Sequence, residues 1–377
     1  MTSPMEFDLG EDLTALADLA GEIFADQAPV DRVVAVERTE GGFDAKLWQT
    51  LADAGLLAAV LPEAAGGGEM GLLGLVAIAE QQGRRLAPVP FVAVVAGAAM
   101  PIAEFGSDAL RARYLEPLTT GQALVTSGFD GVAGDCGLHG RLDGDAVILD
   151  GRVLAVPAAE QASAAVLPVR LADGSQRVVV VDLDAEGVRR EPVATTFRGA
   201  AAHLELTGVR VAADSVLGGE EVVAWTLQRL RLGLAGVQIG VCAQALETTA
   251  QYVSQREQFG RPISTNQAVA VRAADAYLDT ESIRLTTTRA AWLLDTGRAE
   301  EAAAAVLVAK LWAARGGLRA VHATQHLHGG IGADIDYPIH RYFLWGRQLA
   351  FSLGGADQIA AELGASIESA PRIGAPA

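Results

Sequence analysis

Two short stretches of this chain carry residue types suited to binding a phosphate-bearing molecule. In the first, Arg256–Gly260, a permanently charged guanidinium group precedes an aromatic ring, and a guanidinium is a forked donor that matches phosphate oxygens. In the second, His328–Gly332, Gly329 and Gly330 have no side chains, so backbone amides there can approach a phosphate closely. Taken alone, Arg256 is better explained by a surface ion pair, so its interpretation depends on its surroundings.

Long helices are expected on both sides of these stretches. Apolar residues recur at helical spacing through Leu227–Leu246, and Gly233, Gly236 and Gly240 thin one face of that segment. Three glycines in a helix predict close backbone packing against a neighbour. Further helices are predicted over Gln267–Leu294, Glu300–Leu327 and Tyr342–Leu363. Four long helices joined by short loops predict an antiparallel bundle.

The fold predicted for the whole chain is mainly α with a central β domain. Helical periodicity dominates residues 1 to about 117, including helices that begin near Leu13, Ala45, Leu72, Val92 and Ser107. Valine, glycine and aspartate then become frequent, and antiparallel strands forming a small barrel or sandwich are predicted. The predicted strands are 147–149, 164–169, 177–181 and 203–211. We expect three domains: a helical domain over 1–118, a β domain over 119–218 and a four-helix bundle over 219–377.

Composition narrows the function classes. The chain has 377 residues and a net charge of −17, which disfavours nucleic acid and anionic membranes as partners. Cys136 and Cys242 lie far apart and make no metal-binding spacing, so a reduced, cytoplasmic protein without a metal site is expected. The acidic first ten residues do not resemble a signal peptide.

The order of elements and several local stretches resemble the acyl-CoA dehydrogenase family over nearly the whole chain. Arg256–Gly260 followed by Pro262 is similar to the family's most specific motif. His328–Gly332 followed by Tyr337–Pro338 is similar to its second motif. Two such motifs, about 70 residues apart and set within long helices, are far more specific than one.

The resemblance implies a flavoprotein with FAD in a cleft between the β domain and the bundle. It implies that the segment Arg256–Phe259 reaches the pyrophosphate and adenine side of an FAD held mainly by a neighbouring subunit. The cofactor contacts implied for this chain are Arg256, Gln258, Phe259, Gln267, His326, Gly329, Gly330, Val125 and Thr126.

The reaction implied is α,β-desaturation of an acyl-CoA thioester, with an electron-transfer flavoprotein as electron acceptor. A carboxylate removes the α proton, which requires a positioned base, and a hydride leaves the β carbon for the flavin, which supplies the redox chemistry. The apolar helices of the chain suit fatty and sterol-derived acyl groups equally.

The carboxylate base is missing from both positions where the family carries it. The usual position, in the C-terminal segment, corresponds to Gly354, and the other, about seven turns before the motif arginine, corresponds to Leu230. Neither residue accepts a proton, so no catalytic residue is assigned. The nearest carboxylates, Asp357, Glu220 and Glu221, are displaced from these positions, and a solvated surface role is the simpler expectation for each.

The family's flavin contacts in the β domain are also altered. Thr126 matches a residue that faces the flavin ring, but the run that usually follows it is replaced by Ser127–Gly131. The family's tryptophan and threonine beside the flavin correspond to Leu154 and Val156. At the family's glutamine before the double glycine, this chain has His326, for which simple packing at the helix end is the alternative.

One arrangement accounts for these losses together. In actinobacterial steroid side-chain degradation the family includes α2β2 heterotetramers, in which one subunit type carries the base and most flavin contacts. Its partner keeps the fold and lends the arginine–phenylalanine segment across the interface. This chain, with Arg256 and Phe259 present and the base absent, resembles that partner.

Two alternatives remain open. The first is a self-sufficient homotetrameric dehydrogenase whose base has moved to Asp357 or Glu221. The second is a non-enzymatic acyl-CoA-binding or scaffold protein that has lost its flavin. Co-purification with a homologous subunit and the flavin colour of the product distinguish the three hypotheses.

Overall fold

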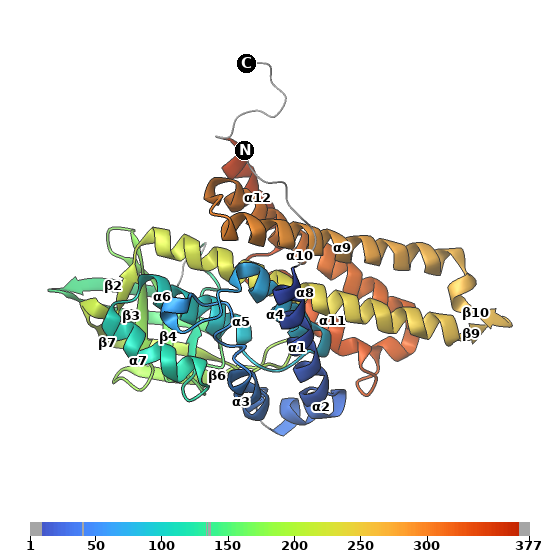
Figure 1. The fold of residues 1–377 in the computed structure, drawn as a ribbon, viewed down its shortest axis with the longest axis horizontal. Coiled ribbons are helices and arrows are strands. Elements are labelled where there is room, and N and C mark those ends of the chain that lie inside the picture. The colour runs from blue at the N-terminus through green and yellow to red at the C-terminus, as the bar shows by residue number, and fades with distance from the viewer. Residues whose placement is uncertain (1–9, 40, 133, 135–136, 369–377) are drawn as a thin grey trace, which may run out of the picture.

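A computed structural model describes residues 10–39, 41–132, 134 and 137–368, with helices at both ends and a sheet between them (Figure 1). The five amino-terminal helices predicted from the sequence begin within two residues of their predicted starts, whereas α2 was not predicted. Two of the helices have side-chain caps: Asp44 accepts from the Leu47 amide and Ser107 from the Leu110 amide. They are α1 Glu11–Gln27, α2 Val30–Thr39, α3 Ala45–Asp53, α4 Gly71–Arg85, α5 Phe91–Val94, α6 Met100–Phe105 and α7 Asp108–Thr119, with short turns η1 Glu63–Ala65 and η2 Val95–Ala99.

The helix predicted from Val92 is interrupted, as Pro101 suggests. The turn just before the proline, η2, is a π-helical turn, and α6 starts at Met100 with the proline in its first turn. A proline cannot donate to the preceding turn, so a π turn is a low-energy way to continue the helix.

The central sheet is mixed, which corrects the prediction of purely antiparallel strands. Its order is β6-β7-β3-β2-β4-β5-β8, and both β1 and β2 pair with β4 in parallel. The four predicted strands lie within β3, β4, β5 and β7, while the shorter β1, β2, β6 and β8 were not predicted. The strands are β1 Val125–Ser127, β2 Leu138–Asp143, β3 Ala146–Pro157, β4 Ala164–Leu171, β5 Gln176–Asp182, β6 Val188–Pro192, β7 Ala201–Val211 and β8 Val216–Gly218, with the turn η3 Ala213–Ser215 before β8.

The carboxyl-terminal helices form the predicted bundle around one very long helix. This helix, α8, runs from the sheet to the far end of the molecule (Figure 1), where β9 and β10 form a hairpin. The bundle elements are α8 Glu220–Gln255, β9 Glu257–Gln258, β10 Arg261–Pro262, η4 Ile263–Thr265, α9 Gln267–Asp295, α10 Ala299–Leu327, η5 Gly329–Ala333, α11 Ile339–Phe351 and α12 Ala356–Glu368.

The predicted helix Tyr342–Leu363 is wrong, because the chain breaks into α11 and α12. The break lies at residues 352–355, where Leu353 has φ 56° and Gly354 has φ 112°. No right-handed helix passes through two consecutive residues of positive φ. The apolar periodicity of the sequence is continuous across this break, so the sequence pattern predicted a single helix.

The glycine face of α8 packs against α4, as the sequence predicts. A β-carbon at Gly240 would lie 1.9 Å from the carbonyl oxygen of Glu80, and one at Gly236 would lie 3.0 Å from that of Val76. The two helix backbones therefore approach too closely for larger side chains. This contact joins the amino-terminal helices to the bundle.

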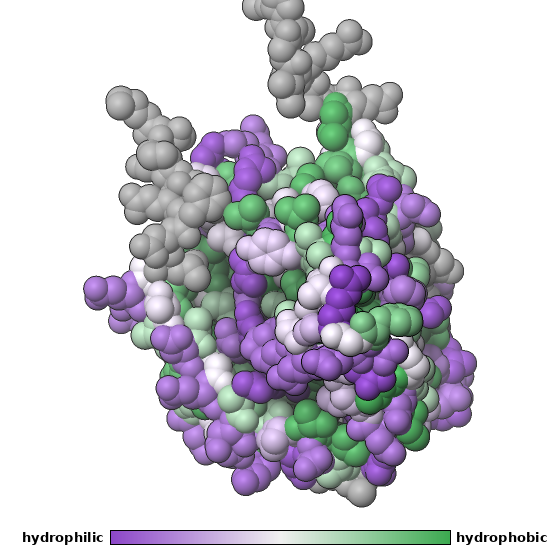
Figure 2. Space-filling view, turned by 90° about the vertical axis from the view of Figure 1, so that its right-hand side faces the viewer, coloured by the Kyte–Doolittle hydropathy of each residue, from purple (hydrophilic) through white to green (hydrophobic). Residues whose placement is uncertain are grey.

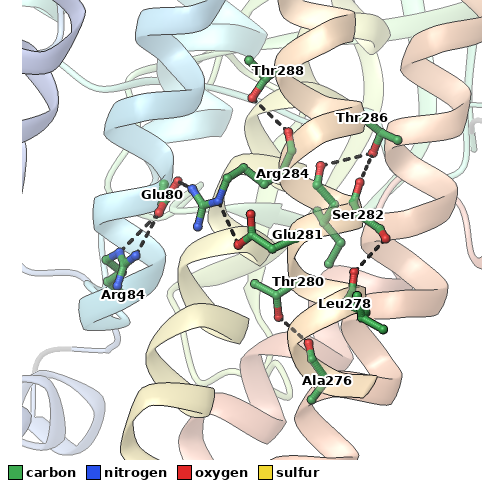
Figure 3. Close-up of polar contacts among 11 residues, drawn as sticks. Glu80, Arg84, Ala276, Leu278, Thr280, Glu281, Ser282, Arg284, Thr286 and Thr288 are labelled. Atoms are coloured by element: carbon green, nitrogen blue, oxygen red, sulfur yellow. Dashed lines mark hydrogen bonds and ion pairs between the residues drawn. The ribbon is translucent and has the colours of Figure 1, made fainter. Parts of the chain in front are cut away.

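An ion-pair network joins α4 to α9 (Figure 3). Glu80 on α4 binds Arg84 one turn later, at 3.2 Å, and also Arg284 on α9. Arg284 makes a second contact, at 3.3 Å, with Glu281 of its own helix. Because Glu80 is mostly buried, this network orients α9 across the amino-terminal helices.

The three-part division predicted from the sequence stays a proposal. The change from helix to strand falls between Thr119 and Val125, and α8 begins two residues after β8 ends. However, buried residues from all three parts form one continuous hydrophobic cluster.

Candidate functional site

A cavity of about 150 Å³ lies where the amino-terminal helices, the sheet and the bundle meet. Its walls come from the end of α4 and the following loop, the loop after β1, β3, the segment before β7, α8 and α11. They are Gln82, Val89, Pro90, Val92, Ala93, Ser127, Gly128, Phe129, Asp130, Leu154, Ala155, Pro157, Thr195, Phe197, Ala200, Ala201, Leu230, Leu234, Val237, Trp345, Gln348, Leu349, Ser352 and Leu353. The lining is mainly apolar, as in most small-molecule sites.

One of the two residues matched to the family's base positions lines this cavity, and the other is next to its lining. Leu230 on α8 lines the cavity, and the buried Gly354 directly follows the lining residue Leu353. A β-carbon at Gly354 would lie 2.8 Å from Cδ1 of Ile359, and its φ of 112° suits glycine alone. The structure thus brings together two positions more than 120 residues apart, and neither supplies a proton acceptor.

The displaced carboxylates proposed from the sequence do not line the cavity. Asp357 is exposed on the first turn of α12. Glu220 and Glu221 are exposed on the first turn of α8. Glu221 accepts a hydrogen bond from the Gly219 amide, which lowers the pKa of its carboxyl group. These positions fit helix-capping and surface roles better than proton transfer in the cavity.

The acidic side chain in the cavity lining is Asp130, which sequence reasoning did not single out. Its Oδ1 accepts a hydrogen bond of 2.6 Å from the Leu353 amide. The carboxylate is open to solvent at the cavity mouth, but protein surrounds it on most sides. This burial raises its pKa, and the Leu353 hydrogen bond and the positive Lys310 offset only part of that effect.

The break between α11 and α12 is held by side chains from distant elements. Asp130 binds the amide of Leu353, while Arg231 of α8 donates to the carbonyl oxygen of Leu353 at 3.3 Å. Arg231 also forms a bidentate ion pair with Glu362 of α12, in which its two terminal nitrogens donate to the two carboxylate oxygens at 2.8 and 2.7 Å. These contacts stabilise a leucine in a left-handed conformation that it rarely adopts.

Lys310 of α10 lies under the same break and is almost completely buried. Its Nζ donates to the carbonyl oxygen of Leu349 at 3.0 Å, at the end of α11. Burial lowers the pKa of Lys310 to about 7, with a further lowering by Arg231 and an opposing effect of Asp130. Nothing in the sequence pattern marks this lysine, because it lies within an apolar helix.

The predicted flavin contacts of the β domain are placed behind the cavity wall. Val125 and Thr126 are fully buried, and the Thr126 hydroxyl donates to the carbonyl oxygen of Pro157 at 2.6 Å. Val156 is also buried, whereas Leu154 lines the cavity with 56% of its surface exposed. The predicted role of Val125 and Thr126 stays a proposal, and Thr126 would have to exchange its partner to fulfil it.

The remaining predicted cofactor contacts gather at the opposite end of the bundle. Ring stacking connects the two motifs there: Tyr252, one turn before Arg256, stacks on His328 with ring centroids 4.5 Å apart. The Tyr252 hydroxyl also donates to the His328 carbonyl oxygen at 3.5 Å. The two stretches identified by their chemistry are therefore neighbours in space.

This end of the bundle is exposed (Figure 2). Phe259, at the tip of the β9–β10 hairpin, is 100% exposed, and open space surrounds the positions where β-carbons would lie on Gly329 and Gly330. Arg256 is exposed and takes part in none of the ion pairs of the described residues. Gln258, Gln267 and His326 are exposed as well. Instead of His326, the neighbouring Gln325 fixes the second motif, by donating to Gly332 O at 2.9 Å.

The cavity and the exposed end are too far apart to serve one small molecule within one chain. Leu230 and Arg256 are separated by 26 positions, roughly 39 Å along a helix axis. Val237, the cavity-lining residue of α8 nearest to Arg256, is 19 positions away, roughly 28 Å. Even the shorter length is close to the diameter of a small domain. The exposed end therefore has the geometry to complete a site on another chain.

FAD fits these two places unequally. At the bundle end, the guanidinium of Arg256 and the backbone amides at Gly329 and Gly330 suit a pyrophosphate. The exposed ring of Phe259 suits an adenine. At the cavity, the hydroxyls of Thr126 and Ser127 already donate to backbone carbonyls. Asp130 would oppose the acceptor-rich edge of a flavin. The cavity as it stands does not fit a three-ring flavin.

Other site classes receive no support from the described residues. None of the described helices combines the length and hydrophobicity that a membrane crossing requires. The same residues contain no group of three or more His, Cys, Asp or Glu side chains placed to hold a metal ion. Cys242 is a buried free thiol whose pKa is raised by burial to about 12. Cys136 and the first nine residues lie outside the described residues.

Two family models match the chain. Residues 10–122 match "Acyl-CoA dehydrogenase, N-terminal domain" and residues 218–367 match "Acyl-CoA dehydrogenase, C-terminal domain". Among curated proteins of Mycobacterium tuberculosis, acyl-CoA dehydrogenase FadE27 is 36% identical over 89% of this chain and 91% of its own length. FadE28 is 32% identical over 84% of this chain and 91% of its own.

Solved structures agree over almost the full length. A variant of the Tcur3481–Tcur3483 steroid ACAD is 43% identical and superimposes with a TM-score of 0.90, covering 96% of this chain and 99% of its own. The ChsE4–ChsE5 complex from Mycobacterium tuberculosis is 35% identical with a TM-score of 0.92, covering 98% of this chain and 100% of its own.

Proposed function

Because the chain belongs to the acyl-CoA dehydrogenase family, we propose that it is the subunit of a heteromeric complex that contributes no base at the family's positions. The family's members are flavoprotein oxidoreductases that act on a CH–CH bond of acyl-CoA, and their cofactor is FAD. Bound FAD would supply the redox chemistry of this reaction. This chain would complete that site from outside, through Arg256 and Phe259.

The observation that carries the proposal is the separation of the two halves of a site. Leu230 and Gly354 leave the cavity without a base at the expected positions, while the exposed Arg256 segment lies roughly 39 Å away along α8. Such a chain is suited to pairing with a homologue that supplies the base and whose cofactor is contacted by the exposed end of this chain. The similarity to a structure named as a ChsE4–ChsE5 complex supports a heteromeric assembly.

We propose an acyl-CoA thioester with a fatty or sterol-derived chain as substrate, and an electron-transfer flavoprotein as acceptor. The steroid ACAD among the similar structures favours the sterol-derived class. In the desaturation, the partner subunit's carboxylate would remove the α proton. The residues of this chain would position the cofactor and exclude water.

Co-expression with a homologous subunit that has the family's carboxylate tests this proposal. We expect the pair to be yellow and to reduce a dye with an acyl-CoA, whereas this chain alone should do neither. A lone chain that binds FAD and turns over the substrate would refute it. A pair that remains colourless would refute it as well.

Arg256→Ala should lower the FAD content of the complex, because it removes a charge-assisted contact to phosphate. Such contacts contribute about 1.5–3 kcal/mol, so the dissociation constant for FAD should rise about tenfold or more. The measurement is the flavin-to-protein absorbance ratio after dialysis. Arg141→Ala, at an exposed arginine on β2, is the matched control and should leave the ratio unchanged. An unaltered ratio in the Arg256 variant would exclude the proposed role.

A second candidate function rests on Asp130. As the carboxylate in the cavity lining, with a raised pKa, it has the properties of a relocated base in a self-sufficient homomeric enzyme. Asp130→Asn distinguishes the candidates. Turnover by the heteromeric complex should survive this substitution if the base belongs to the partner, whereas turnover by this chain alone should be lost if Asp130 is the base.

A further inference from the structure

The ring of His328 contacts two other aromatic rings at the exposed end of the bundle. It stacks on Tyr252 of α8, with centroids 4.5 Å apart and an angle of 23° between the two planes. Tyr337, in the segment before α11, lies against the same imidazole with centroids 5.4 Å apart. Aromatic pairs at such distances attract each other beyond the effect of burial alone. The imidazole thus joins segments that are distant in the sequence.

Tyr252 and His328 are each attached directly to one of the two motifs. The Arg256 amide donates to the Tyr252 carbonyl oxygen at 2.8 Å, and the Ile263 amide donates to the Arg256 carbonyl oxygen at 2.9 Å. These bonds connect Tyr252 to the β9–β10 hairpin. On the other side, His328 directly precedes Gly329 and η5. A movement of the imidazole relative to Tyr252 therefore moves the two motifs relative to each other.

Hydrogen bonding indicates the tautomer of His328. Its Nδ1 lies 2.8 Å from the Thr324 carbonyl oxygen, and a carbonyl oxygen only accepts, so Nδ1 carries a proton. In the neutral ring Nε2 is then an acceptor, and this buried atom has no hydrogen-bond partner among the described residues. The whole residue is only 3% exposed. The stacked conformation thus suits an uncharged imidazole.

The surroundings of the ring disfavour its protonated form. Burial lowers the pKa of His328, and the hydrogen bond to Thr324 offsets only part of that effect. The titratable groups packed on the ring are the phenols of Tyr252 and Tyr337, and burial raises the pKa of Tyr337. None of the ion pairs of the described residues includes His328. A proton on Nε2 would be buried without a partner, which is unfavourable.

The sign of the pH effect follows from this burial. The stacked form of His328 binds a proton less readily than an open form in water, because its pKa lies below the ordinary value of 6.5. As the pH falls through that ordinary value, protons therefore favour the open form. Above it, both forms are neutral and the stack with Tyr252 is fully stabilising.

We propose that His328 is a positioning residue: its neutral ring holds the Arg256 segment against the second motif, and its protonation releases that segment. The inference rests on the proposed function, in which both motifs contact a cofactor of the partner subunit. His328 acts through Tyr252 and the backbone of Gly329 rather than by touching the cofactor. Acid should therefore weaken the hold of this chain on FAD.

Hydrogen–deuterium exchange of the full-length chain, without partner or FAD, tests the coupling between about pH 7.5 and about pH 5.5, where histidines titrate. Rates are corrected with an unfolded reference at each pH. We expect residues 256–263 and 329–333 to lose protection together in acid, by about two- to tenfold, as for the loss of an aromatic stack. His328→Phe keeps a ring that cannot titrate, so its protection should change less than about twofold. His328→Leu should show low protection at both pH values.

The co-expressed complex supplies a second measurement, the dissociation constant for FAD at the same two pH values. The constant of the parent should rise about two- to tenfold in acid, whereas that of His328→Phe should stay nearly constant. His322→Phe is the same substitution at an exposed histidine of α10, and it should behave like the parent at both pH values.

The phenylalanine variant decides the outcome even if His328→Leu fails to fold. Loss of protection in acid by His328→Phe, to the same extent as in the parent, would overturn the proposal. A flavin-loaded parent complex with equal affinity at both pH values would overturn the proposed release. If exchange follows the expected pattern but the complex binds no FAD, the coupling is supported and the proposed function is refuted instead.

Discussion

Lys310 should make the free energy of unfolding depend on pH. Its folded pKa of about 7 lies below the ordinary value of 10.5, so between these values the unfolded chain binds more protons than the folded one. The free energy of unfolding should therefore rise as the pH increases above about 7, and this gain is lost as the pH falls toward 7.

Lys310→Met should remove that dependence. We expect the variant to be no less stable than the parent at pH 7, and the stability of the parent relative to the variant to increase from pH 7 toward pH 9. Urea unfolding of both proteins across this range measures the difference. A constant difference at all pH values would contradict the shifted pKa.

Gly354→Glu should not restore a base. The residue has φ 112°, and a β-carbon there meets Ile359 at 2.8 Å, so the variant should lose about 1–3 kcal/mol of stability. Dye reduction with an acyl-CoA by the Gly354→Glu chain alone should stay at background. Gly355→Glu is the matched control, because a β-carbon there has its nearest contact at 3.5 Å and should cost much less. Turnover by the Gly354 variant would show that the missing base is the only defect.

At the scale of elements, the α4–α9 network positions the cavity wall that α4 carries. Glu80→Gln leaves Arg84 and Arg284 with a weaker partner (Figure 3). Since these arginines are about a third exposed, we expect a loss of only about 1–2 kcal/mol. Thermal unfolding measures it. Glu281→Gln, which weakens an ion pair within α9 alone, should cost about 0.5 kcal/mol or less.

The helix break at residues 352–355 is an element that sequence periodicity did not predict. Apolar spacing continues from α11 into α12, so one helix was expected. The break depends on Asp130, Arg231 and Lys310, which come from a loop, α8 and α10. These contacts span between 39 and 223 residues, and no local pattern contains them. Asp130, the carboxylate of the cavity lining, was missed for the same reason.

At the scale of the whole molecule, exposed apolar side chains indicate an assembly surface. Tyr277, Leu278 and Leu285 on α9 are 55%, 61% and 50% exposed, and Phe259 at the bundle end is fully exposed. Apolar groups that gather on one helix of a folded chain mark an interaction site more often than chance exposure does. This surface is continuous in sequence with the proposed cofactor-binding end.

Leu278→Asp combined with Leu285→Asp should dissociate the complex. Burying two carboxylates at an apolar interface is strongly unfavourable, so we expect a shift to smaller species in size-exclusion chromatography with light scattering, with flavin lost as well. Leu142→Asp, at a residue 68% exposed on β2, is the control and should assemble normally. An intact complex of the double variant would place the interface elsewhere.

The sequence by itself determined the order of helices, sheet and bundle, the close backbone packing of the glycine face of α8, and the two motifs proposed to bind the cofactor. These features depend on periodicity, on glycine spacing and on residues adjacent in the chain. Only the tertiary structure decided that α4 is the neighbour of that glycine face, that Arg256 lies roughly 39 Å from Leu230 of the cavity, that the sheet is mixed, and that Asp130 rather than Asp357 reaches the cavity. Which distant side chains meet is set by how the elements pack, and local spacing does not encode it.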